Sequence, residues 1–426
     1  MRSNPHVLYI AYWGAAEPLG QSLVVPAVKR LADLGVTLTL VTFEKPEDLD
    51  KKAEFRAIRD SLEKSGVNWI PLTYHKRPRI PATAFDVAHG VWRGTMLGLR
   101  SRPDIVHART FVGGLIGRVL APLIGAKLIY HNEGFYPDEQ VDGGVWLAGS
   151  MQHRIAKHLE RKLYERSDGI IALSDQARDA IEHLPAVSRK GTPVAVVPSC
   201  VDLNHFRAAQ PRTPAQQNGL RLVYIGSVGG RYILDRIGRF TAVASEMLGA
   251  VQLRVLTRAE PALVTSMLDL SGLDRAVWSM AAVNRELMPQ ELAIHDAGLF
   301  FLTWGLSEHG CSPTKIGEYW AMGLPVVSTA NVSDSDEIIL REQVGVIVNE
   351  HTDAEYRRAI GELQALMKDP GLAGRCRRAA EQYYALTPAC KRQINLYRKV
   401  IERFNDAEIN TGAEAGCCPA SGMRVD

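Results

Sequence analysis

Short runs of consecutive apolar residues recur along the chain, each followed by a longer stretch with helical spacing. In the first half they predict strands at 7–13, 37–43, 67–72, 104–108, 127–131, 169–174 and 194–198. In the second half they predict strands at 221–226, 251–256, 276–280, 297–302, 325–329 and 345–348. Continuous rather than alternating apolar strands are typical of parallel sheets covered by helices on both faces. The pattern therefore predicts an α/β protein with two doubly wound, Rossmann-like sheets in tandem.

The length and one change of composition divide the chain. At 426 residues, of which 46% are apolar, the chain is expected to fold as two domains of roughly 200 residues each. The Pro-, Gln- and Asn-rich stretch 198–220 has the composition of a linker. We therefore predict a first domain at 1–208, a second at 209–385, a C-terminal helix at 386–408 and a disordered tail at 409–426.

Charge and cysteine usage exclude several classes of protein. The net charge is only +3, and Lys and Arg are spread among almost as many acids, which argues against nucleic-acid binding. The six cysteines have neither metal-site nor disulfide spacing, which fits a reducing cytoplasm. The apolar stretch 111–130 is interrupted by Arg118 and Lys127, so no membrane-spanning helix is predicted. The first apolar run is short for a signal peptide and is interpreted as a buried strand.

The candidate chemistry centres on HGCSPTKIGEYWAMGLPVVST, residues 309–329. Ser312 is a good N-cap and Pro313 suits the first helical position, so a helix is predicted to run to Met322, where Gly323 ends it. Ligands of doubly wound sheets bind outside the carboxyl ends of the strands. Free backbone N–H groups at such a helix entrance favour an anion, and Lys315 adds a full positive charge.

Glu318 lies farther inside the same predicted helix, roughly 7.5 Å along its axis. That separation is about the span from a diphosphate to a ribose diol, and a carboxylate accepts two hydroxyl hydrogen bonds well. The spacing is compatible with a nucleoside diphosphate held between the helix entrance and Glu318. An ordinary cap, a solvated Lys315 and a surface ion pair of Glu318 explain the same spacing equally well.

A family resemblance favours the first interpretation. SPTKIGEYWAMGLPVV (312–327) resembles the donor-site signature of family-four, retaining glycosyltransferases of the GT-B fold, in the variant S-P-T-K-x-x-E-Y-x-A-x-G-x-P-V-V. Every fixed position matches. Four further stretches resemble the same subgroup: EPLGQSLVVPAVKRLADLG (17–35), DIVHARTFVGG (104–114), GFYPDEQVDGGVW (134–146) and IGSVGGRY (225–232). The resemblance thus spans nearly the whole chain apart from its ends.

The resemblance implies both a fold and a reaction. The fold would be GT-B: two Rossmann-like domains facing a cleft, with the C-terminal helix crossing back to the first domain. The reaction would be the retaining transfer of a sugar from a nucleoside-diphosphate sugar to a hydroxyl of a sugar, glycan or lipid-linked acceptor, in polysaccharide or glycoconjugate biosynthesis. No cofactor is implied, and the family needs no divalent metal for catalysis.

Cations are required because the leaving diphosphate develops negative charge in the transition state. Arg231 and Lys315 are the predicted catalytic cations, and Gly229 and Gly230 would let the backbone approach the phosphates. Gly20, followed by Gln21, would do the same from the first domain. A simple tight turn is the alternative for each glycine.

Strand-end residues complete the predicted site. His131, the third predicted catalytic residue, ends its strand and is predicted to face the cleft. It matches a family histidine that contacts the sugar or the diphosphate, and the alternative is a satisfied strand-end histidine. His107 and Arg109 end the preceding strand and are expected to supply one contact. The remaining predicted substrate-binding residues are Arg258, Arg285, Ser312, Pro313 and Thr314. A solvated surface arginine is the alternative for Arg285.

The chain departs from the family pattern at two positions. The broader family has a Glu-x7-Glu pair, but Gly310 stands eight residues before Glu318, and Glu308 is out of register. Glu133 stands where the subgroup often has an arginine, which suggests an acceptor carrying an amine or a sugar diol. Asp138 and Glu139 could orient the acceptor or solvate a loop. The D-x-D at 334–336 begins a helix after a strand and is not interpreted as a metal site.

Two functional alternatives and one surface remain open. A nucleotide-sugar 2-epimerase shares the fold but needs further acids and histidines around the sugar, and a catalytically silent nucleotide-sugar-binding protein would keep the same residues. HKRPRI (75–80) and the apolar positions of FDVAHGVWRGTMLGLR (85–100) could dock on an anionic membrane surface, or form a domain helix with a solvated basic side. The predicted location is the cytoplasm, with peripheral contact at the inner face of the membrane.

Overall fold

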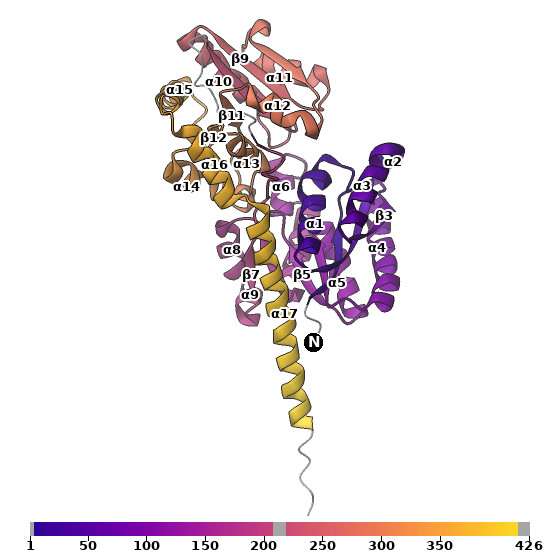
Figure 1. Cartoon of the computed structure of the whole chain (residues 1–426). Coiled ribbons are helices and arrows are strands. Elements are labelled where there is room, and N and C mark those ends of the chain that lie inside the picture. Colours follow the sequence, from indigo (N-terminus) through magenta and orange to yellow (C-terminus); the bar gives the residue numbers. More distant parts are fainter. Residues whose placement is uncertain (1–3, 208–218, 416–426) are drawn as a thin grey trace, which may run out of the picture.

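The computed structural model describes residues 4–207 and 219–415. Its two halves each contain one parallel sheet with helices on both faces, and a long C-terminal helix connects them (Figure 1). The predicted boundary between residues 208 and 209 lies outside the described residues.

The sheet of the first half has seven parallel strands in the order β3-β2-β1-β4-β5-β6-β7. At its centre β1 pairs with β2 on one side and with β4 on the other, so that Tyr9 lies opposite both Leu40 and His107. The strands are β1 (His6–Ala11), β2 (Thr37–Glu44), β3 (Asn68–Thr73), β4 (Ile105–Arg109), β5 (Lys127–His131), β6 (Gly169–Ala172) and β7 (Val194–Val196).

The sheet of the second half has six parallel strands in the order β10-β9-β8-β11-β12-β13. Its strands are β8 (Leu220–Ile225), β9 (Val251–Leu256), β10 (Trp278–Ala281), β11 (Ala297–Phe300), β12 (Val326–Thr329) and β13 (Gly345–Val348). In both sheets the first strand of the half lies at the centre, and the chain winds outward in both directions. That order places the loops that follow the central strands at one edge of each sheet.

Helices connect successive strands. The first half contains a π-helix η1 (Gly20–Val24) and the α-helices α1 (Val25–Asp33), α2 (Pro46–Leu49), α3 (Lys52–Lys64), α4 (Arg79–Ser101), α5 (Phe111–Leu123), α6 (Tyr136–Asp142), α7 (Met151–Arg166), α8 (Asp175–Glu182) and α9 (Pro185–Lys190). The second half contains α10 (Leu234–Leu248), α11 (Pro261–Leu270), α12 (Met288–Ala293), α13 (Thr314–Ala321), α14 (Ser335–Glu342), α15 (Asp353–Met367) and α16 (Leu372–Tyr383), with the 3₁₀ turns η2 (Arg275–Val277), η3 (Arg285–Leu287) and η4 (Leu306–Gly310).

The fold class and all thirteen predicted strands are confirmed, each strand within a few residues of its predicted ends. These strands could be recognised because they are buried on both faces. β1, β4, β6, β11 and β12, for example, consist entirely of buried residues. A sheet covered on both sides requires apolar side chains at successive positions, and this requirement produces the continuous runs.

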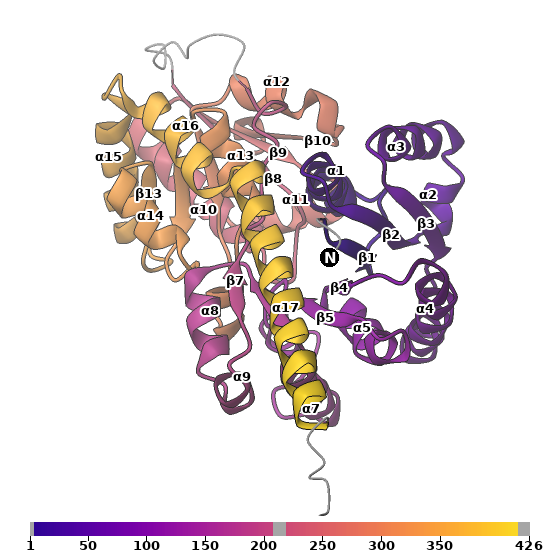
Figure 2. The same ribbon diagram turned by 60° about the horizontal axis from the view of Figure 1, so that its bottom comes forward.

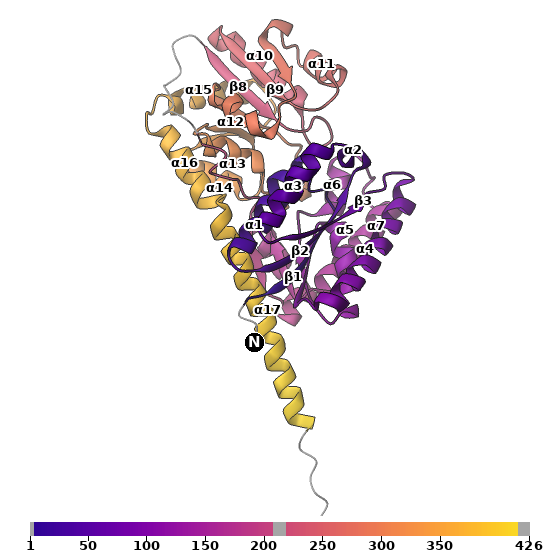
Figure 3. The same cartoon turned by 45° about the vertical axis from the view of Figure 1, so that its right-hand side comes forward.

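The C-terminal helix α17 (Leu386–Ala415) leaves the second half and runs along the first, as Figures 2 and 3 show from two directions. Its buried residues Ala389, Ile394 and Tyr397 belong to the same core cluster as Val7 and Tyr9 of β1. The helix continues to Ala415, so residues 409–415 are helical and not part of the predicted disordered tail. The rest of that predicted tail, residues 416–426, lies outside the described residues.

Within the described residues, no helix is both long enough and apolar enough to cross a membrane. The apolar helix α5 ends at Leu123, shortly before Lys127 at the start of β5.

Candidate functional site

The α13 segment begins differently from the prediction. The helix starts at Thr314, and Pro313 rather than Ser312 occupies the cap position, without a side-chain capping bond. The hydroxyl of Ser312 accepts a hydrogen bond from the backbone N–H of Ser199 at 3.1 Å, in the segment that joins the two halves. Ser312 therefore contacts the first half of the chain and does not cap the helix. Gly323, at φ +75°, ends the helix as predicted.

Lys315 points from the first turn of α13 toward the loop after β8. A Cβ atom at Gly226 would lie 2.2 Å from its Cε, so a glycine is required for the side chain to pass. The ammonium lies 3.6 Å from the ring centroid of Tyr232. The Nζ atom is buried and has no hydrogen-bond partner among the described residues. Burial lowers the pKa of Lys315, and the nearby Tyr232 opposes that shift.

Glu318 follows one turn later and is half-buried. Burial raises the pKa of its carboxyl to about 7, and the positive charges of Arg285 and Lys315 oppose that shift. No described residue donates a hydrogen bond to this carboxylate. Arg285 lies close enough to influence it and packs its guanidinium over the ring of Phe206 at 5.5 Å. The structure thus brings Lys315, Glu318 and Arg285 together.

Arg231 is already engaged by side chains from both halves. Its guanidinium donates to the Ser307 hydroxyl at 2.7 Å and to the Cys311 sulfur at 3.0 Å, and lies 3.6 Å from the Glu139 carboxylate of α6. Gly229 has φ +86°, a conformation that favours glycine.

The other predicted residues of this loop region are more open. Gly230 has φ +61°, and a Cβ atom added at Gly229 or at Gly230 would meet no other atom within 4 Å. Arg258 is exposed and donates to the Asn284 side chain at 3.4 Å. The space around the two glycines agrees with the predicted close approach of a ligand to the backbone.

The predicted strand-end residues of the first half contact one another inside the domain. The ring nitrogens of His107 and His131 lie 3.1 Å apart, and the other ring nitrogen of His107 lies 2.8 Å from the Tyr397 hydroxyl of α17. Arg109 forms an ion pair with Glu133 at 2.6 Å. His131 is only 2% exposed and lines the small cavity between the first half, the linker and α17. Burial and the charge of Arg109 lower the pKa of both histidines well below the usual range.

Glu133 is therefore not available to an acceptor, contrary to the prediction. Its carboxylate oxygen lies 2.6 Å from Arg109 and 3.1 Å from the His131 ring. Breaking a buried ion pair costs several kcal/mol, because the remaining charge is left uncompensated. Glu133, which stands where the resembled subgroup often has an arginine, thus balances the positive charge of Arg109 inside the domain.

Gly20 and Gln21 stabilise their own loop. A Cβ atom at Gly20 would lie 1.8 Å from the carbonyl oxygen of Gly14, so the close approach that needs this glycine is to Gly14. The side-chain amide of Gln21 donates to the carbonyl of Ala16 at 3.0 Å. The sequence correctly singled out a position that excludes a side chain, and the structure gives a local reason for it.

Gly310 explains the missing family glutamate. A Cβ atom at this position would lie 3.1 Å from Gly134 Cα and 3.1 Å from the Phe135 ring. With the two halves packed in this way, a side chain at 310 would press on the loop after β5, whose atoms would have to shift slightly to accept it. The absence of the first acid therefore accompanies a direct contact between the halves.

Several contacts between the halves were missed by the sequence analysis. The carboxylate of Asp334 accepts from the backbone N–H groups of Asp175 at 2.6 Å and Gln176 at 3.2 Å, the first residues of α8. Asp142 of α6 accepts from the backbone of Ser307 at 3.0 Å. Asp334, the first acid of the D-x-D at 334–336, thus binds the start of a helix in the other half. No group of three potential metal ligands occurs within the described residues.

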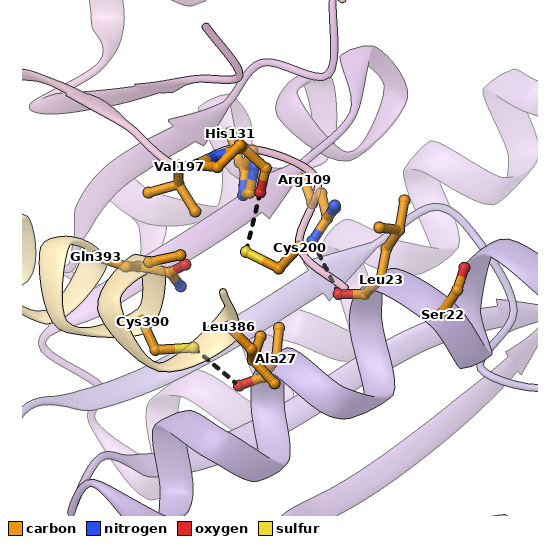
Figure 4. Close-up of a pocket in the computed structure, with 12 residues that line it drawn as sticks. Ser22, Leu23, Ala27, Arg109, His131, Val197, Cys200, Leu386, Cys390 and Gln393 are labelled. Atoms are coloured by element: carbon orange, nitrogen blue, oxygen red, sulfur yellow. Dashed lines mark hydrogen bonds between the residues drawn. The ribbon is translucent and has the colours of Figure 1, made fainter. Parts of the chain in front are cut away.

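Two cavities lie where the halves and α17 meet. One, of about 20 Å³, lies between the first half, the linker and α17, and is shown in Figure 4, with Arg109, His131 and Cys200 among its lining residues. A volume of that size holds roughly one water molecule and no sugar. The other, of about 380 Å³, is lined by Ser312 and by Asp334 among others.

Comparison with known proteins agrees with this fold. Residues 24–200 match the family model of the glycosyl transferase 4-like domain. No curated protein sequence matches the chain. Among solved structures, sucrose-phosphate synthase from Thermosynechococcus elongatus is 15% identical with a TM-score of 0.68, over 94% of this chain and 100% of that one.

Two further structures are similar. A glycosyltransferase from Rickettsia africae is 13% identical with a TM-score of 0.65, over 94% of this chain and 99% of that one. Anabaena HepE in complex with UDP-glucose is 14% identical with a TM-score of 0.62, over 95% of this chain and 100% of that one. At these identities the similarity shows the fold. Residues 24–200 therefore match a glycosyl transferase 4-like domain, and the described chain has the GT-B fold of these structures. The domain match supports a transferase enzyme.

Proposed function

We propose that this protein is a retaining glycosyltransferase that moves a sugar from a nucleoside-diphosphate sugar to a hydroxyl of an acceptor, in polysaccharide or glycoconjugate synthesis. The observation that carries the proposal is a pair of groups on α13: the buried Lys315 ammonium, whose Nζ atom has no hydrogen-bond partner within the described residues, and the half-buried Glu318 carboxylate, whose pKa burial raises to about 7. Buried polar groups normally have partners, so the unpartnered ammonium requires an explanation. A diphosphate would satisfy Lys315, and a ribose diol would satisfy Glu318.

The proposed chemistry requires only side chains and backbone of this chain. Lys315 and Arg231 would offset the negative charge that builds on the departing diphosphate. Gly229 and Gly230 leave the backbone after β8 open to phosphate oxygens. The two cations differ in their hydrogen bonds. Arg231 already donates to Ser307 and Cys311, so a donor diphosphate would have to compete with these acceptors.

Donor binding in the known neighbours points in the same direction. HepE of Anabaena was crystallised with UDP and with UDP-glucose, which makes a uridine diphosphate sugar the first donor to test on this chain. The proposal includes neither a metal ion nor a cofactor, so turnover is expected to persist in excess chelator.

The proposal can be tested by combining calorimetry with turnover. A panel of nucleoside-diphosphate sugars is screened by thermal shift, and the best donor is titrated into wild type, Glu318→Ala and Lys315→Ala. Glu318→Ala is expected to weaken donor binding, because the carboxylate–diol contact is lost. Lys315→Ala is expected to reduce the rate of nucleoside diphosphate release by roughly 10²-fold or more.

A matched control separates these effects from general damage to the domain. Lys368→Ala changes a lysine of the same domain, at the C-terminal end of α15, and should retain wild-type binding and turnover. Donor binding without any turnover in wild type would favour a silent binding protein. Wild-type affinity in Glu318→Ala would exclude the ribose contact.

A further inference from the structure

Helix α4 carries its small residues inside and its large apolar residues outside. The buried positions of the helix are Ala82, Asp86, Gly90, Gly94 and Gly98. A Cβ atom at Gly94 would lie 2.4 Å from Leu120 of α5, and one at Gly98 would lie 2.6 Å from Ile124. The glycine seam lets α4 and α5 pack closely, and it leaves no room for large side chains on the inner face.

The outer face of α4 is apolar over almost its whole length. Ile80, Phe85, Trp92, Met96 and Leu99 are each between 43% and 70% exposed. At 100° per residue the last four fall within about 60° of one another around the helix. The remaining exposed residues between Ile80 and Leu99 are Pro81, Ala84 and Ala88. We call these exposed residues between 80 and 99 the α4 stripe. One charged residue lies beside it: the partly exposed Arg93, whose guanidinium is 5.8 Å from the ring centroid of Trp92.

Such a face is unusual for a helix at the surface of a domain. In Figure 1, α4 forms the outer edge of the first half, away from the second half. A helix in that position normally turns its charged residues to solvent and its large apolar residues to the core. The neighbouring α5 adds exposed Val119 and Leu123. A contiguous exposed apolar patch of this kind marks an interaction surface.

The charges around the α4 stripe are positive at both ends. Lys76, Arg77 and Arg79 are exposed before it, and Arg100 and Arg102 are exposed after it.

Within α4 no acid faces solvent. The one acid of the helix, Asp86, is buried and accepts from the Tyr12 hydroxyl at 2.8 Å and contacts the His75 ring at 2.6 Å. The surface is therefore apolar along the stripe and cationic at each end, with one further cation, Arg93, beside Trp92.

This charge arrangement distinguishes between the candidate occupants. Pairing of the stripe with that of a second copy brings cations against cations, whether the two helices run parallel or antiparallel, because both ends are basic. A bilayer surface with anionic headgroups satisfies both ends and accepts the apolar stripe between them. Trp92 lies in the middle of the stripe, and tryptophan is favoured at the level of the headgroups.

We propose that the α4 stripe docks this protein on the surface of a membrane containing anionic phospholipids, with α4 lying flat in the interface. The proposal goes beyond the transfer reaction and does not depend on it, because no residue of the donor site takes part. The contact is peripheral: the stripe would enter the headgroup region while α5 holds α4 to the domain.

The test is sedimentation of the full chain with vesicles, with or without phosphatidylglycerol in phosphatidylcholine. Wild type is expected to bind the anionic vesicles and to bind pure phosphatidylcholine at least about tenfold more weakly. The double variant Phe85→Glu/Trp92→Glu should lose at least about tenfold of the binding to anionic vesicles. The matched control is Leu270→Glu/Leu340→Glu, whose positions are 84% and 68% exposed in the second half, and it should bind like wild type.

Each outcome decides the proposal. Circular dichroism and the thermal midpoint show whether the variants fold. If the double variant does not fold, vesicle binding is measured with the milder Trp92→Ala variant instead. Equal binding of the stripe variant and wild type overturns the proposal, as does failure of wild type to bind anionic vesicles. A vesicle-free dimer that the stripe variant abolishes would assign the face to a second copy instead. Donor affinity is measured in a separate experiment without vesicles. A protein that fails to bind the donor would contradict the proposed function and leave the membrane proposal unaffected.

Discussion

At the scale of single residues, the proposed donor site contains two ionisable side chains whose burial favours their uncharged forms. Lys315 and Glu318 are three residues apart on α13, a spacing that places them on one side of the helix. Burial lowers the pKa of Lys315 and raises that of Glu318 to about 7. An anionic diphosphate beside Lys315 would favour its charged form, so donor binding and protonation of this site should be coupled.

The shifted Glu318 predicts a pH dependence of stability that can be measured without any substrate. The ordinary pKa of a glutamate is 4.5 and the folded value is about 7, so between these pH values the folded state holds a proton that the unfolded state releases. Stability is therefore lost as pH rises through this window. Glu318→Gln removes the loss, and its advantage in thermal midpoint over wild type should grow from pH 5 to pH 8.

Glu355 provides a control of opposite sign. Hydrogen bonds from Arg358 and Asn349 lower the pKa of its carboxyl to about 2, so this carboxylate contributes stability at every pH above that value and across the measured range. Glu355→Gln should lower the thermal midpoint by a similar amount at pH 5 and at pH 8. A constant difference between Glu318→Gln and wild type across the same range would contradict the assigned shift.

At the scale of elements, the strands were predictable and the orientation of α4 was not. A strand buried on both faces requires apolar residues at successive positions, so β1 or β12 can be recognised from a short run of consecutive apolar residues. The sequence of α4 has large apolar residues and glycines at compatible helical spacings, and only the packing against α5 decides which face is buried. The exposed side of α4 is mainly apolar, with Arg93 beside Trp92 and the other basic residues at the ends.

The glycine seam between α4 and α5 predicts a specific sensitivity. A methyl group at Gly98 would lie 2.8 Å from Ile124 Cγ2 and 3.1 Å from its Cβ, so the helices must separate. Overpacking of this kind typically costs about 1–3 kcal/mol, and Gly98→Ala should lower the thermal midpoint by several degrees. Gly361→Ala on α15 is the control, because nothing lies within 4 Å of its Cβ position.

The control should move the midpoint in the other direction. Replacing a helix-interior glycine by alanine gains up to about 1 kcal/mol when the space is free. Gly361→Ala is therefore expected to keep or raise the midpoint, while Gly98→Ala lowers it. If both variants were stabilised by the same amount, the close approach of α4 and α5 would be refuted.

At the scale of the whole molecule, the two halves are held by contacts that no local pattern encodes. Asp334 meets α8 across 159 positions of sequence, and Arg231 of the second half meets Glu139 of the first. Glu133 was misinterpreted for a related reason: its partner Arg109 lies on a neighbouring strand, so the pairing depends on the sheet and not on adjacent residues. Residue types at strand ends could be predicted, but their partners across the fold could not.

The strongest of these contacts predicts how the halves separate. The Asp334 carboxylate accepts from the first two N–H groups of α8, where free donors and the helix dipole favour a negative charge. Hydrogen bonds to a charged group are worth about 1.5–3 kcal/mol. If separation of the halves exposes these amides, Asp334→Ala should speed hydrogen exchange at Asp175 and Gln176 by roughly 10- to 100-fold.

Asp336 offers a control two residues away, because the same type of side chain accepts from the backbone N–H groups of Asn331 and Val332 within its own half. Asp336→Ala should speed exchange at those two amides and leave Asp175 and Gln176 protected as in wild type. Small-angle scattering then reports the consequence for shape: only the Asp334 variant is expected to become more extended. Unchanged exchange at Asp175 and Gln176 in that variant would show that other contacts, such as Ser307 with Asp142, suffice to keep the two halves together.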